Sequence, residues 1–143
     1  MNVELRGPSR PTCPVLYEHQ ADPVAASMAA FPSRDREAFM AHWERILADE
    51  TVVVRAIVAD GALAGNVLSF DRDAVREVGY WLGREFWGSG IATAALAAFL
   101  RIETTRPLYA GVAPHNGGSL RVLAKCGFVA CGEEDDRVLL RLD

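Results

Sequence analysis

Two glycines separated by one residue, Gly88 and Gly90, precede a stretch from Ile91 to Leu100 in which every residue except Thr93 is small or apolar. Such a stretch predicts a helix packed against a sheet. The first turn of a helix leaves backbone N–H groups without partners, and its positive end attracts anions. Because glycine has no Cβ, a phosphate can approach the backbone closely. The pattern predicts a phosphate-binding turn, and a tight strand-to-helix turn without a ligand is the alternative.

Two common nucleotide-binding patterns do not match this turn. A Walker loop needs a lysine directly after its last glycine, but Ile91 follows Gly90. A Rossmann fingerprint needs a third glycine at the position that Thr93 occupies. Neither class of nucleotide site is therefore expected.

Two signatures in this chain resemble those of the GCN5-related N-acetyltransferases. The resemblance is to the branch of that superfamily that is similar to the ribosomal-protein N-terminal acetyltransferases. The family's pyrophosphate loop is Q/R-x-x-G-x-G/A, and here Trp87-Gly88-Ser89-Gly90-Ile91-Ala92 matches it with tryptophan in the first position. Downstream, "HNGGSLRVLAKCGF" resembles N-x-x-S followed by L-x-K-x-G-F. The resemblance implies a GNAT fold of class α/β (α+β), whose mostly antiparallel sheet is splayed between its middle strands and flanked by helices.

The resemblance implies acetyl-CoA as donor and an amine as acceptor, either a protein N-terminus or a small molecule, with direct transfer in a ternary complex. The edge Tyr80-Trp81-Leu82 would bind the pantetheine amides, and Asn116 would contact the same arm. Ser119 would lie near the sulfur. The pyrophosphate would bind the loop residues Trp87, Gly88, Ser89, Gly90, Ile91, Ala92 and Thr93. A non-catalytic acyl-CoA-binding module with the same fold is the alternative.

Acetyl transfer requires a base for the amine, a donor for the oxyanion and an acid for the thiolate. Glu77, on the strand that would line the slot, is the candidate base, with a water relay from a backbone carbonyl or a merely solvated carboxylate as alternatives. The oxyanion would meet a backbone N–H of the Trp81-Leu82 segment. The resemblance places Ser119 near the sulfur, which makes it the candidate acid. The tyrosine that serves many relatives as the acid has no counterpart after Asn116. Helix capping is the alternative role for Asn116 and Ser119.

The elements that must position these residues follow from periodicity. Residues 1–12 are expected to be irregular, and prolines suit the starts of helices over 14–20 and 23–30. Phe31 to Glu50 predicts a helix that Ser33 caps and in which Trp43 is core. Strands are expected over 52–59, 62–69, 77–83 and 107–113, with a hairpin at Asp60-Gly61. A helix over 116–125 and two final strands complete a single domain over 1–143.

Composition limits the remaining classes of function. The chain has 143 residues, half of them hydrophobic, and a net charge of −4, which argues against nucleic acid as a partner. No apolar run is long enough to cross a membrane, and no metal-spaced cluster occurs. The three cysteines indicate free thiols in a reducing, cytoplasmic compartment. The acidic turn 133–136 favours a cationic acceptor, with a solvated loop as the alternative, and a homodimer is compatible with the family.

Overall fold

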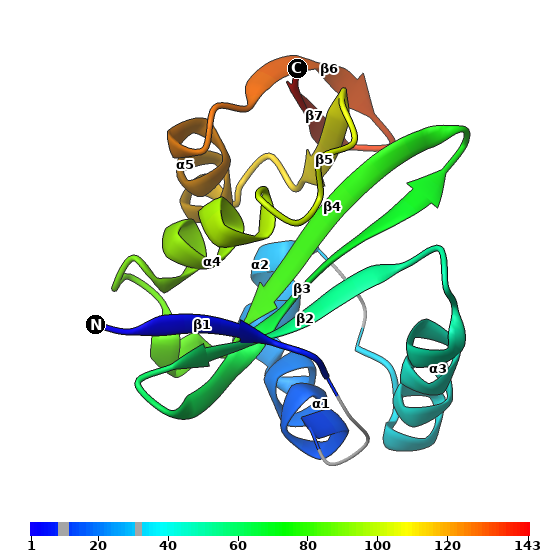
Figure 1. Cartoon of the computed structure of the whole chain (residues 1–143), viewed down its shortest axis with the longest axis vertical. Helices are drawn as coiled ribbons and strands as arrows, with labels where there is room; N and C mark the ends of the chain where they lie inside the picture. The colour runs from blue at the N-terminus through cyan, green and yellow to red at the C-terminus, as the bar shows by residue number, and fades with distance from the viewer. Residues whose placement is uncertain (9–11, 31–32) are drawn as a thin grey trace.

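A seven-stranded sheet in the order β1-β2-β3-β4-β5-β7-β6 is the frame of the molecule in the computed structural model, which describes residues 1–8, 12–30 and 33–143. Figure 1 shows the helices arranged around this sheet. The elements are β1 (Val3–Arg6), α1 (Cys13–Ala21), α2 (Pro23–Ala29), α3 (Arg36–Ala48), β2 (Val53–Ala59), β3 (Ala62–Arg72), β4 (Val75–Leu82), the 3₁₀ turn η2 (Arg84–Phe86), α4 (Ile91–Phe99), β5 (Leu108–Val112), α5 (Gly117–Lys125), β6 (Val129–Glu134) and β7 (Arg137–Leu142).

The first strand was not expected from the sequence. Val3–Arg6 pairs antiparallel with β2, and Leu5 lies opposite Ile57. The segment has only two apolar residues, too few to reveal a two-residue period, and its strand state depends on pairing with β2. The prediction that residues 1–12 are irregular is therefore wrong for this part of the segment. Residues 9–11 lie outside the described residues.

The expected hairpin between β2 and β3 is confirmed. Ala59 pairs with Ala62, and the two turn residues between them, Asp60 and Gly61, have φ values of 48° and 84°. Glycine takes this left-handed conformation without the steric cost of a Cβ, and aspartate tolerates it. The turn sets the pairing of Ala59 with Ala62, and the register shifts by one residue between Ile57 and Val58.

The middle of the sheet is splayed, as expected. The described residues of β4 and β5 form only two backbone pairs, Arg76 with Leu108 and Glu77 with Tyr109, both parallel. Beyond them the strands diverge, whereas the other neighbours in the sheet pair antiparallel. The divergence leaves the β5-facing edge of Gly79 to Leu82 without a strand partner. This opening is where the candidate site forms.

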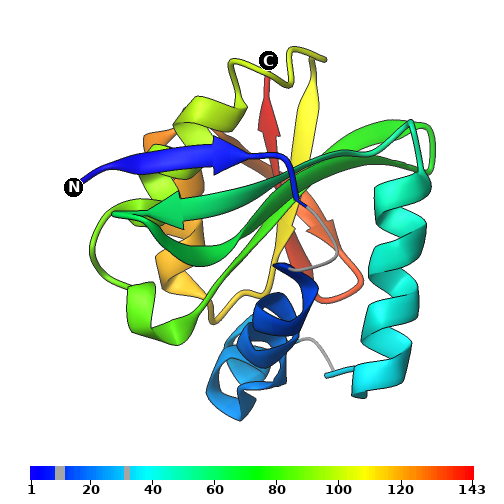
Figure 2. The same ribbon diagram turned by 60° about the horizontal axis from the view of Figure 1, so that its bottom comes forward.

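Helices cover both faces of the sheet (Figure 2). On one face α4 and α5 pack on the larger core, in which Leu96 and Phe99 are fully buried. On the other face α1 and α3 pack on a second core that includes Leu16, Phe39 and Trp43, so the prediction of a buried Trp43 is confirmed. The prediction that Ser33 caps α3 is wrong. Asp35 is the N-cap, and its side chain accepts a hydrogen bond from the Ala38 N–H (2.8 Å). Phe31 and Pro32 lie outside the described residues.

A buried ion pair ties β4 to the end of α4. Arg76 Nε donates to Glu103 Oε1 at 2.6 Å, and the Ser69 hydroxyl donates to the same oxygen at 2.7 Å. Burial alone would raise the pKa of Glu103, but the hydrogen bonds from Arg76 and Ser69 outweigh it and lower that pKa. The carboxylate is therefore stable as an anion inside the fold.

In the described part of the chain, no helix is both long and apolar enough to cross a membrane. The three cysteines are free thiols: Cys13 is buried, Cys126 half-buried and Cys131 exposed.

Candidate active site

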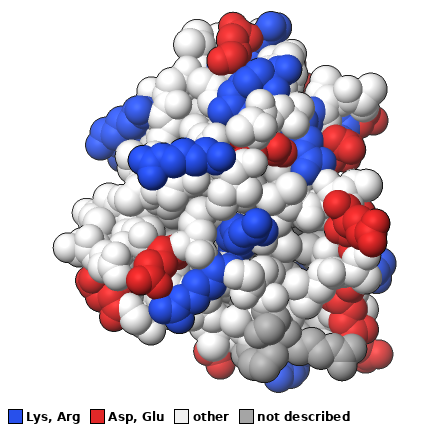
Figure 3. All heavy atoms as spheres, in the orientation of Figure 1, with Lys and Arg blue, Asp and Glu red and all other residues white. Residues whose placement is uncertain are grey.

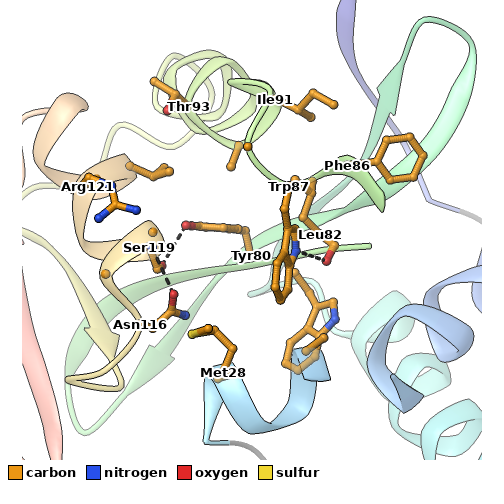
Figure 4. Close-up of a pocket in the computed structure, with 18 of the residues that line it drawn as sticks. Met28, Tyr80, Leu82, Phe86, Trp87, Ile91, Thr93, Asn116, Ser119 and Arg121 are labelled. Carbon is orange, nitrogen blue, oxygen red and sulfur yellow. Dashed lines mark hydrogen bonds between the residues drawn. The ribbon is translucent and has the colours of Figure 1, made fainter. Parts of the chain in front are cut away.

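A cavity of about 610 Å³ opens where β4 leaves β5. Its walls come from five places: the end of β4, the loop that leads into α4, the first turn of α4, one side of α2, and α5 with the residues just before it (Figure 4). The described residues that line it are Ala25, Met28, Ala29, Tyr80, Trp81, Leu82, Phe86, Trp87, Gly88, Gly90, Ile91, Ala92, Thr93, His115, Asn116, Gly117, Gly118, Ser119, Arg121, Val122 and Lys125. All the predicted cofactor-binding residues except Ser89 are among them.

The glycine turn has the geometry of an anion site. Gly88 and Gly90 have φ values of 76° and 83°, and Gly90 is the N-cap of α4. The Ala94 N–H donates to Gly90 O at 3.1 Å, so the N–H groups of Ile91 to Thr93 have no partner within the helix. A Cβ built on Gly88 would meet no atom within 4 Å, which shows that this side of the turn is open. The residues present therefore fit a phosphate group.

Trp87 and Ser89 use their polar atoms inside the loop. The Trp87 indole N–H donates to Leu82 O at 3.0 Å, and the Ser89 hydroxyl donates to Phe86 O at 3.0 Å. Ser89 is exposed and does not line the cavity. Trp87, which replaces the usual Gln or Arg, therefore fixes the loop against β4, and the backbone amides remain available for an anion.

The centre of the cavity holds a hydroxyl pair. Tyr80 Oη and Ser119 Oγ are 2.8 Å apart, which is the usual length of an O–H···O hydrogen bond. Burial raises the pKa of Tyr80 above its ordinary value of 10.0, although the hydrogen bond with Ser119 acts in the opposite direction. Tyr80 is therefore protonated at neutral pH and can donate a proton.

The sequence reasoning anticipated Tyr80 for its backbone and missed its hydroxyl. A tyrosine acid would be expected after Asn116, whereas the Tyr80 side chain comes from β4. Strand alternation was the available signal, because Tyr80 lies on the same face as Val78 and Leu82, which belong to the core under α4. The same alternation directs Tyr80 toward the helix that carries Ser119.

Asn116 caps α5, as the alternative for this residue predicted. Its side-chain oxygen accepts a hydrogen bond from the Ser119 N–H at 3.2 Å. Ser119 contributes only its backbone to this cap, and its hydroxyl contacts Tyr80. One residue of the N-x-x-S signature therefore orders the helix start, and the other brings a hydroxyl to the cavity.

Glu77 is not brought together with the hydroxyl pair. It lies on the opposite face of β4 from Tyr80 and is not among the cavity-lining residues. Its buried carboxylate is 3.3 Å from Arg137 Nη2 and 3.6 Å from Arg72 Nη1. The role of Glu77 as base stays a prediction.

The cationic groups of the lining lie on α5. Arg121 and Lys125 line the cavity, whereas the Arg84 guanidinium is 3.0 Å from the carboxylate of Asp22. Arg121 is therefore better placed than Arg84 to meet a phosphate. Basic and acidic side chains otherwise appear in separate small groups on the face drawn in Figure 3. Among the described residues, no three His, Cys, Asp or Glu side chains form a group that could hold a metal ion.

The fold and the site together define a class of protein. The model of the acetyltransferase (GNAT) domain matches residues 2–129, and the chain belongs to this family. A relative from Bacillus subtilis (strain 168), named "Putative ribosomal N-acetyltransferase YdaF", is 33% identical over 109 residues. These residues cover 71% of this chain, and the chain spans only 59% of that relative. The suspected GNAT family is thereby confirmed, and the relative named is similar to this chain over the part that it spans.

Solved structures share the fold at low sequence identity. Aminoglycoside acetyltransferase AAC(6')-Ib in complex with coenzyme A has a TM-score of 0.83 and 18% identity, covering 99% of this chain and 94% of its own. The microcin C7 self-immunity acetyltransferase MccE in complex with acetyl-CoA and AMP has a TM-score of 0.78 and 21% identity, covering 98% and 91%. A GNAT-family acetyltransferase from Bacillus anthracis has a TM-score of 0.81 and 14% identity, covering 99% and 95%. These likenesses confirm the GNAT fold.

Proposed function

We propose that this protein transfers the acetyl group of acetyl-CoA directly to a primary amine in a ternary complex. The observation that carries the proposal is the Tyr80–Ser119 pair, which stands in the cavity between the glycine turn and α2. The family relationship and two fold neighbours bound to coenzyme A or acetyl-CoA support the choice of donor.

Successive groups of residues along the cavity suit successive parts of acetyl-CoA. The N–H groups at Gly88 to Thr93, with Arg121 nearby on α5, would hold the pyrophosphate. The β5-facing edge of Tyr80 to Leu82 would pair with the pantetheine amides, because the splay removes its strand partner there. Asn116 and Ser119 would then border the thioester end.

The transfer forms a nitrogen–carbon bond at the amine and breaks the carbon–sulfur bond of the thioester. One proton leaves the nitrogen and one reaches the sulfur. Bound acetyl-CoA supplies the activated acetyl group. The Tyr80 hydroxyl gives its proton toward the sulfur, and Ser119 orients that hydroxyl. This assignment makes Tyr80 the acid, whereas the sequence alone favoured Ser119.

Glu77 remains the proposed base. Because its carboxylate lies on the far face of β4 and contacts Arg137, it would receive the amine proton through water. A water held by a backbone carbonyl is the alternative route. The oxyanion would meet a backbone N–H of Trp81 or Leu82.

A thiol-release assay tests the proposal. The protein is incubated with acetyl-CoA and with primary amines of several classes, including a peptide with a free N-terminus, and free CoA thiol is measured. Amine-dependent thiol release is the expected result. If acetyl-CoA binds but no amine releases thiol, the chain is an acyl-CoA-binding module. The homodimer stays a prediction, which light scattering tests.

A further inference from the structure

The wall of the cavity opposite the Tyr80–Ser119 pair is formed by one face of α2. Ala25, Met28 and Ala29 lie at spacings of three and four residues, which places them on the same side of the helix. Figure 4 shows Met28 extending from α2 into the cavity, toward Asn116 and Tyr80. The α2 wall, as we call these three residues, is uncharged and apolar.

Contacts at both ends hold α2 against the loops on either side of the cavity. At its start, the Asp22 carboxylate accepts a hydrogen bond from the Val24 N–H and is 3.0 Å from Arg84 Nε. Near its end, His115 Nε2 lies 2.9 Å from Ser27 O. The wall is therefore placed relative to both the glycine turn and the start of α5. The Asp22 carboxylate is therefore already paired with Arg84.

Charge in the cavity lining has one sign. Among the described lining residues the ionisable side chains other than Tyr80 are His115, Arg121 and Lys125, and none is an Asp or Glu. The acidic turn 133–136 and Glu77 are not part of this lining. A second ammonium on an acceptor would lose water here without gaining a carboxylate partner, which is unfavourable.

We infer that the acceptor is a primary amine carried by an uncharged, apolar group, and that polycationic amines are poor acceptors. The inference rests on the proposed acetyltransferase function and names its substrate class. It differs from the expectation of a cationic acceptor, which relied on net charge and on the acidic turn. A small apolar amine and a peptide with an apolar first residue present the same chemistry at the α2 wall.

An acceptor panel at saturating acetyl-CoA tests this inference. The probes are 2-phenylethylamine, spermidine, and two short peptides that begin with leucine or lysine. We expect kcat/KM for 2-phenylethylamine to exceed that for spermidine by about tenfold or more, and the leucine peptide to exceed the lysine peptide likewise. The faster of the two apolar probes tells whether the acceptor is a small molecule or a chain end. Equal or faster acetylation of the polycationic probes overturns the inference.

A charge introduced into the α2 wall should invert this preference. Met28→Glu supplies the missing carboxylate, and we expect it to shift the ratio of kcat/KM values toward spermidine by about tenfold. Val24→Glu is the matched control, because Val24 is 45% exposed on the same helix and does not line the cavity. It should leave the ratio unchanged. An unchanged ratio in a folded Met28→Glu protein overturns the role of the α2 wall.

Binding measurements separate this inference from the proposed function. If no amine releases thiol, the proposed function fails, and calorimetry on the protein saturated with CoA then decides the acceptor class. Tighter binding of 2-phenylethylamine than of spermidine supports the inference, and the reverse order overturns it.

Discussion

The hydroxyl pair of the cavity allows the acid to be identified by a double-mutant cycle. Tyr80→Phe removes the phenol and keeps the ring, whereas Ser119→Ala removes the serine hydroxyl and keeps the backbone N–H that donates to Asn116. Each substitution therefore removes one member of the 2.8 Å contact and leaves the helix cap in place.

The expected losses differ in size because the two hydroxyls have different proposed roles. General acids contribute about 10² to 10⁴ in rate, and the low end applies here because a thiol, with a pKa of about 8.5, leaves readily. Tyr80→Phe should lower kcat by about 100-fold, which is about 2.7 kcal/mol. Ser119→Ala should lower kcat by about fivefold, the effect of one neutral hydrogen bond of about 1 kcal/mol.

The double variant gives the decisive comparison. Because Ser119 acts through Tyr80, adding Ser119→Ala to Tyr80→Phe should cost almost nothing further, so the coupling free energy is about 1 kcal/mol. The assay is steady-state thiol release at saturating acetyl-CoA and 2-phenylethylamine. Thermal unfolding of each variant checks that the fold is intact, with an expected loss of about 1 kcal/mol or less per hydroxyl.

Two outcomes would refute this reasoning. If Ser119→Ala loses about 100-fold and Tyr80→Phe loses little, the serine is the acid, as the sequence alone suggested. If both variants keep kcat within about threefold of the wild type, the thiolate leaves without an acid from this pair. The pH profile is a further check, because the raised pKa of Tyr80 means that loss of its proton should not reduce the rate below pH 10.

Three further predictions concern other parts of the fold. Gly90→Val should weaken CoA binding by about tenfold or more, because the side chain and the φ of 83° disturb the turn. Gly61→Val, at a φ of 84° in the distant hairpin, carries the same strain and should leave the calorimetric CoA affinity unchanged. Glu77→Gln should lower kcat and flatten its rise with pH if Glu77 is the base, and an unaltered pH–rate profile would assign the base to a water chain. Glu103→Gln should lower the free energy of unfolding at pH 7 by about 2 kcal/mol in denaturant titrations, because it removes a charge-assisted hydrogen bond of Arg76 and leaves the exposed Asp71 carboxylate as its anion. Since the pKa of folded Glu103 is lowered, this contribution is present above pH 4.5 and should disappear as the pH falls through the folded pKa.

Local chemistry made part of the molecule predictable from sequence. Gly88, Gly90 and Asp60-Gly61 occur where the chain needs positive φ, so the turns could be placed without any tertiary information. The apolar stretch after Gly90 likewise allowed the position of α4 to be predicted. A helix that is buried on most sides must be apolar on most sides.

What the sequence did not reveal depends on contacts between distant segments. Tyr80 and Ser119 are 39 residues apart, on β4 and α5, and only the tertiary fold brings their hydroxyls together. The α2 wall was likewise invisible, since Ala25 and Met28 become a cavity surface only when α2 is fixed by Asp22 and His115. Asp35 rather than Ser33 caps α3, because the Ser33 hydroxyl donates to Gln20 O instead.

The two-pair junction of β4 and β5 makes the sheet a pair of half-sheets joined at one end. A ligand that lies in the gap bonds to both halves and so resists their separation during unfolding. Ligand binding should therefore increase resistance to heat and to proteases. The free energy of unfolding should rise by about 2.7 kcal/mol when the free ligand is at 100 times its Kd. The melting temperature of this protein becomes a gauge of CoA concentration, and it would remain one in a variant that had lost all turnover.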